Sequence, residues 1–153
     1  MSQVTQVLSF NSCCRCMNVV VTLESMCPRD VERCLKILAF FEERTDIVHA
    51  LLRERDERQL LGNVDDFAIS LALAVGVSYM VRLSEKRGEF DRRIGAEFRG
   101  RITLAGLLPG DIVGLCQDLF IEELELPATI ARNDALKENV WMMAICMELR
   151  EAI

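Results

Sequence analysis

The sequence is poor in glycine, proline, histidine and aromatic residues. Its 153 residues include 8 Gly, 3 Pro and 1 His, and aromatic residues make up only 6%, with 1 Trp and 1 Tyr. Scarce Gly and Pro disfavour a β-sandwich, whose many turns use both residues, and favour helices. The single His, His49, also leaves few ways to build a zinc site.

Long apolar runs and an excess of basic charge are also missing. The longest run without a charged residue, Phe67 to Val81, is shorter than the roughly 20 residues that a membrane-spanning helix needs. The 24 acidic and 18 basic side chains give a net charge of -6, which argues against a general nucleic-acid binder. The first residues lack the basic and apolar regions of a signal peptide. We therefore expect a cytosolic (cytoplasmic) protein with reduced thiols and no transmembrane segment.

What is present is a globular composition with helical periodicity. Apolar residues make up 51% and charged residues 27%, enough for one domain with a core. Apolar side chains recur every three to four residues, which predicts a mainly α fold of about five helices and a last helix at the end. The expected helices span residues 28–41, 47–62, 67–83, 94–98, 111–126 and 133–153.

Individual residues refine this prediction. Pro28 suits a first helical turn, and Asp111 is expected to cap the helix that follows a loop at 100–110. The segment 67–83 is apolar nearly all round and should be the most buried helix. Four residues are expected to share the apolar face of the last helix: Leu136, Val140, Met143 and Met147. The β-branched segment 18–23 could form a short strand.

The usual catalytic and metal motifs are weak. Cys13 and Cys16 form a Cys-x-x-Cys pair, but a second pair at matching spacing is missing. We expect packed or incidental thiols and no metal site. His49 lies in a helical pattern and is expected on the helix surface or partly buried, so no nucleophile triad is predicted.

A phosphate cradle is also absent. No Gly is followed by Lys, so the chain has no Walker A loop, and 119–123 is a poor imitation of a Walker B strand. This chain alone should not hydrolyse ATP. The basic residues of 82–101 alternate with acidic ones, which is typical of a solvated helix face.

Two segments nevertheless resemble a known family. The first, Ser25-Met-Cys-Pro-Arg-Asp-Val-Glu-Arg-Cys-Leu35, resembles the S-x-R-D-V-x-R signature of the helical lid in dynein-like AAA+ modules. In that family the first Arg is the sensor-2 residue, which matches Arg29 here; Arg33 matches the second. An Arg at a helix start can place its guanidinium group on a γ-phosphate. The chain departs from the signature at Cys27-Pro28, where the family has a small hydroxyl residue and an aliphatic one.

The second segment, residues 130–149, resembles the stretch before a Walker A loop in mysterin-like proteins, the giant RING-finger AAA+ E3 ubiquitin ligases. Residues 116–120 and the apolar helix 68–79 fit the same family. The resemblance covers roughly residues 25–150.

The resemblance implies a division of the chain and a role for each part. Residues 25–126 would be an AAA+ lid-like helical domain, and 127–153 a linker and the helix that leads into the next module; 1–24 stay unassigned. Arg29 and Arg33 would sense nucleotide, and Ile130, Arg132 and Asn133 would lie near the following nucleotide pocket. ATP, magnesium, the ubiquitin machinery and the neighbouring AAA+ modules are implied as cofactors and partners of the intact family protein. No cofactor and no catalysis are expected for this chain alone.

Two alternatives stay open at this stage. One is a stand-alone helical adaptor that binds a partner helix through a Leu/Met groove. The other is a small zinc-binding module that uses Cys13, Cys16 and further thiols.

Overall fold

The computed structural model describes residues 28–56, 61–99, 102–127 and 129–150. Within these ranges the fold is all helical, without a strand, and its six α-helices are joined by short 3₁₀ and π segments. The α-helices are α2 (Pro28–Glu42), α3 (Ala50–Arg55), α4 (Asp66–Ser78), α5 (Arg87–Phe98), α6 (Pro109–Glu123) and α7 (Asp134–Leu149). The predicted bundle of about five helices with one more helix after it is therefore confirmed. The segments 1–24 and 18–23 lie outside the described residues.

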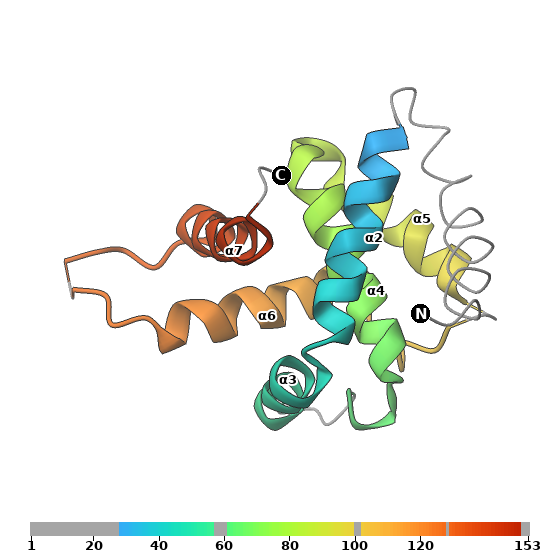
Figure 1. Ribbon diagram of the computed structural model, residues 1–153, viewed down its shortest axis with the longest axis horizontal. Coiled ribbons are helices and arrows are strands. Elements are labelled where there is room, and N and C mark those ends of the chain that lie inside the picture. Colours follow the sequence, from blue (N-terminus) through green and yellow to red (C-terminus); the bar gives the residue numbers. More distant parts are fainter. Residues whose placement is uncertain (1–27, 57–60, 100–101, 128, 151–153) are drawn as a thin grey trace.

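Helix α4 is the centre of the bundle. All its side chains from Ala68 to Ser78 are buried, as its lack of a polar face predicts. Helix α2 packs on one side of α4 and α6 crosses it on another, while α7 lies against α6 (Figure 1). The core therefore runs continuously from α2 through α4 to α6 and α7.

The crossing of α4 and α6 depends on a glycine. A Cβ added to Gly76 would lie 2.2 Å from Val113 Cγ2, far closer than real carbon atoms approach. The missing side chain lets the two helices pack closely, which explains a glycine inside the most buried helix.

Several predicted boundaries are wrong. The predicted helix 47–62 is instead a π segment at Thr45–His49 followed by α3, which ends at Arg55. Helix α4 stops at Ser78, and a 3₁₀ turn at Met80–Arg82 takes the place of its predicted last residues; a second 3₁₀ turn, Ser84–Lys86, leads into α5. Pro109 and Gly110 belong to α6 and not to the loop, because Pro suits a first helical turn.

Asp111 acts from the first turn of α6 and not from the position before it. The backbone N–H of Leu108 donates to Asp111 Oδ2 at 2.8 Å. Asp91 of α5 accepts from the Gly110 N–H at 2.8 Å. Two carboxylates therefore bind the N-terminal end of α6, where the helix dipole favours negative charge.

Candidate functional site

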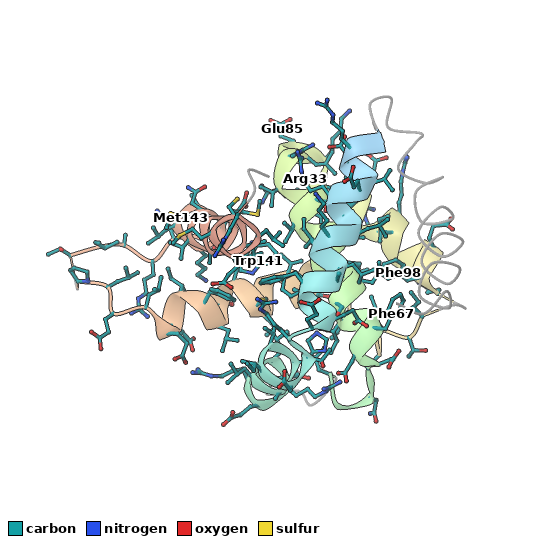
Figure 2. All side chains as sticks on the ribbon, viewed as in Figure 1. Arg33, Phe67, Glu85, Phe98, Trp141 and Met143 are labelled. Carbon is teal, nitrogen blue, oxygen red and sulfur yellow. The ribbon has the colours of Figure 1, made fainter. Side chains whose placement is uncertain are left out.

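The beginning of α2 carries the two predicted nucleotide-sensing residues. Arg29 is exposed there, whereas Arg33 is half-buried, with Nη1 3.6 Å from Asp30 Oδ1. Arg82, just after α4, donates from Nη1 to the same Asp30 oxygen at 3.0 Å. The helix start is thus fixed to the end of α4, and of the two predicted residues only Arg29 extends from an exposed position (the Arg33 side chain is labelled in Figure 2).

Helix α7 is held to the bundle by a buried aromatic side chain. Trp141 is fully buried and Ile145 is 1% exposed; Figure 2 shows Trp141 directed from α7 toward the bundle. A buried Trp side chain contributes about 3–5 kcal/mol relative to Ala. This contact makes α7 a structural part of the domain and not a loosely attached extension.

Cys116 of α6 lies beside this aromatic side chain. Burial raises the pKa of the Cys116 thiol to about 12, and the neighbouring Trp141 side chain only partly opposes this rise. A thiol with such a pKa stays protonated at neutral pH and is a poor nucleophile or metal ligand.

Ion pairs surround the buried contact of α7. Both guanidinium Nη atoms of Arg87 donate to Glu138, at 2.5 and 2.7 Å. Lys137 Nζ lies 2.5 Å from Asp118 Oδ1 of α6, and Arg44, after α2, lies 3.4 Å from Glu148. Hydrogen bonding to the partner carboxylates raises the pKa of Arg87 and of Lys137 above their usual values. The start of α5, the body of α6 and the end of α2 are therefore each tied to α7.

The predicted nucleotide loop before α7 is exposed. Ile130 and Arg132 are solvent-accessible, and Asn133 accepts a hydrogen bond from the Leu136 N–H at 2.8 Å. Asn133 is thus the N-cap of α7. Figure 1 shows this loop well separated from the start of α2, so the fold does not bring the two predicted sets of residues together.

The apolar face predicted for α7 is only partly buried: Leu136 and Val140 are half-buried, but the two Met residues predicted with them are not. Met143 is 59% exposed and Met147 is 70% exposed, whereas Trp141 and Ile145 are buried. The sequence contains two apolar faces on this helix, and periodicity alone does not say which one packs inward.

A buried polar cluster was missed altogether. His49, predicted at the surface or partly buried, has no solvent exposure; its Nδ1 lies 3.1 Å from Asp66 Oδ1 and its Nε2 lies 3.2 Å from Ser70 Oγ. Arg53 donates to the same Asp66 oxygen at 2.6 Å. Hydrogen bonds from Arg53 and His49 lower the pKa of Asp66, and the bond from Arg53 has the larger effect.

This cluster resembles a catalytic Ser–His–Asp triad only in that Ser70, His49 and Asp66 are hydrogen-bonded in this order. Ser70 is fully buried on the packed face of α4, so its hydroxyl cannot meet a substrate. The cluster instead satisfies a buried imidazole and fixes the π segment to the first turn of α4. Its only sequence signal would be the spacing of Asp66 and Ser70, which places both on one helix face.

No metal site and no membrane span emerge from the residues that the structure describes. Within these ranges no three His, Cys, Asp or Glu side chains gather as ligands could, and no helix combines the length and apolarity needed to cross a membrane. Cys13, Cys16 and Cys27 lie outside the described residues.

Comparison with known proteins relates this helical domain to ubiquitin ligases. The chain is homologous over 80% of its length to E3 ubiquitin-protein ligase RNF213 of Homo sapiens, at 37% identity over 126 residues, and to the Mus musculus protein at 34%. It is 35% identical over 122 residues to E3 ubiquitin-protein ligase rnf213-beta of Danio rerio. The matched part is only 2% of each of these proteins.

No family model matches the chain, and no solved structure matches it. The family resemblance noted in the sequence is therefore supported by homology to RNF213, while the position of the segment within an AAA+ module is a matter of proposal.

Proposed function

We propose that this chain is a mechanical coupling segment of an RNF213-like AAA+ ATPase and E3 ubiquitin ligase of the cytosol. In this proposal residues 25–126 are the lid of one AAA+ module, and 127–153 lead into the next. The chain performs no catalysis itself. ATP and magnesium bind to the neighbouring modules, and the ubiquitin machinery acts elsewhere in the full protein.

The docking of α7 on α6 is the observation that carries this proposal. Transmission of a lid rotation requires that the last helix move with the bundle as one body. A fully buried Trp141 and the ion pairs of Lys137 and Glu138 support such a rigid connection. A helix joined to the bundle only by its loop would transmit little of the lid's rotation.

Nucleotide sensing is assigned to the start of α2. Arg29 is exposed at a helix end whose direction is fixed by the contact of Asp30 with Arg82. In the proposal Arg29 contacts the γ-phosphate bound by the preceding large domain, and Arg33 holds the helix turn through Asp30. Ile130, Arg132 and Asn133 lie near the nucleotide pocket of the following module.

The proposal is tested by ATP turnover in two settings. The isolated chain with ATP and magnesium should give no phosphate release above a blank. In a longer polypeptide that contains the flanking modules, Arg29→Ala should lower turnover by about a hundredfold, because one charged donor to the transition state is lost. Arg92→Ala, a change at another exposed arginine, is the control. Turnover by the isolated chain, or equal turnover by Arg29→Ala and the control, contradicts the proposal.

A second candidate is a stand-alone helical adaptor. An open groove along α6, from Gly110 to Glu122, favours it, since such grooves bind partner helices. An adaptor should be a monodisperse monomer, whereas a segment of a larger ring should associate through the apolar surface that its neighbours would cover. Gel filtration separates the two candidates.

A further inference from the structure

An open groove runs along one face of α6. Its volume is about 680 Å³, and its described walls are α6, the end of α3 and the turn at 105–107. The α6 residues that line it extend from Gly110 to Glu122, a length of about 18 Å at the helical rise. The groove is therefore as long as a short helix laid beside α6.

A glycine in this groove has no packing reason within the described chain. Gly114 lies in the middle of α6, where Gly is about 1 kcal/mol less favourable than Ala. A Cβ added there would meet nothing within 4 Å, in contrast to Gly76, whose Cβ position is occupied by Val113. Gly114 thus leaves space at the groove that no described side chain fills, and half-buried Leu107 and Leu115 offer apolar contact beside it.

The charge of the groove points to the chemistry of its occupant. Among the described lining residues are four carboxylates, those of Asp56, Asp111, Asp118 and Glu122, and one cation, Arg55. Asp56 is buried and accepts from the Leu61 N–H at 2.6 Å, and Asp118 pairs with Lys137 of α7. The acidic excess therefore lies at Asp111 and at Glu122 with its neighbour Glu123. Arg55 already pairs with Glu122 and with Glu123 at 3.5 Å. A phosphate backbone would be repelled by this surface, whereas Lys and Arg side chains would be attracted.

We propose that the groove along α6 is a docking site for a basic amphipathic helix of a partner protein. Apolar side chains of that helix would cover Gly114 and Leu115, and its basic flank would face Asp111 and Glu122. This inference is independent of any nucleotide role of α2.

A peptide-binding measurement on the full chain tests the proposal. The probe is a fluorescent synthetic amphipathic helix of about 12 residues with a Leu face and Lys flanks, and a second peptide carries Glu in place of every Lys. Anisotropy at low salt should show that the Lys peptide binds about tenfold or more tightly than the Glu peptide. Equal binding of the two peptides would overturn the proposed chemistry.

Two substitutions locate the binding. Gly114→Leu fills the groove and should weaken Lys-peptide binding about tenfold or more. Gly88→Leu, at an equally open helical glycine on α5, is the matched control and should bind like the parent. Unchanged binding by Gly114→Leu overturns the site. A concentration-dependent dimer that Gly114→Leu abolishes also overturns it, because the occupant would then be a second copy of this chain.

Discussion

At the scale of single residues, the polar cluster at the start of α4 joins one carboxylate, that of Asp66, to two partner side chains. Asp66 binds Arg53 at 2.6 Å and His49 at 3.1 Å, and these bonds lower its pKa. A lowered pKa in the folded state stabilises the protein above the ordinary pKa, and this contribution is lost as the pH falls through the folded value.

Asp66→Asn should therefore lower the free energy of unfolding at pH 7 by about 1 kcal/mol, because the half-exposed carboxylate is screened by solvent. The difference from the parent should shrink as the pH falls below about 4. Urea unfolding at several pH values measures both effects. Asp65→Asn is the control, since the exposed Asp65 side chain makes no cap hydrogen bond. An equal loss in the two variants, or a loss independent of pH, would contradict the assignment.

Cys116 should be unreactive while the protein is folded. Its burial and its pKa of about 12 keep the thiol protonated, whereas Cys146 on α7 is only half-buried. Iodoacetamide labelling followed by mass spectrometry should modify Cys146 before Cys116, and Cys116 only on global unfolding. Labelling of Cys116 at the rate of Cys146 in native buffer would show that α7 opens away from α6.

At the scale of helices, close packing is decided by a few small residues. Gly76→Ala should destabilise the protein by about 2 kcal/mol or more, because the new methyl group overlaps Val113. Gly114→Ala, a matched change at an open position, should stabilise it by about 1 kcal/mol through helix propensity. Thermal or urea unfolding gives both values. The double variant Gly76→Ala with Val113→Ala should lose less stability than the sum of the losses in the two single variants. Additive losses would mean that the overlap is not the cause.

Much at this scale could be predicted from the sequence. The sequence correctly predicts the buried apolar helix α4 and a last helix that begins near residue 133, because both depend on local spacing. The predicted helix at 94–98 is only the C-terminal part of α5, which begins at Arg87. The buried face of α7 and the burial of His49 are not predicted correctly, because each depends on which distant surface the helix meets. Where Arg29 acts stays a prediction.

The ion pairs around α7 should couple it to α5. Arg87 and Glu138 form a bidentate ion pair, with hydrogen bonds of 2.5 and 2.7 Å. A double-mutant cycle with Arg87→Met and Glu138→Gln should give a coupling energy of about 1 kcal/mol that decreases with salt. A coupling energy of zero at low salt would leave the buried Trp141 contact as the main attachment of α7.

At the scale of the whole molecule, the bundle and α7 form one continuous core. The core connects Phe41 at the end of α2, Leu73 in α4 and Trp141 in α7, so a movement of α2 cannot leave α7 behind without exposing buried surface. This continuity is what the proposed coupling role requires. Exposed Met143 and Met147 on the opposite face of α7 leave that face available for a further contact.

Native-state hydrogen exchange of α7 is the decisive measurement for the coupling role. If α7 and the bundle are one mechanical body, the amides around Trp141 should exchange nearly as slowly as those of α4, and both should open together in mild denaturant. Exchange of α7 within seconds while α4 remains protected would contradict the account, because a helix that detaches so readily cannot carry the movement of the bundle onward.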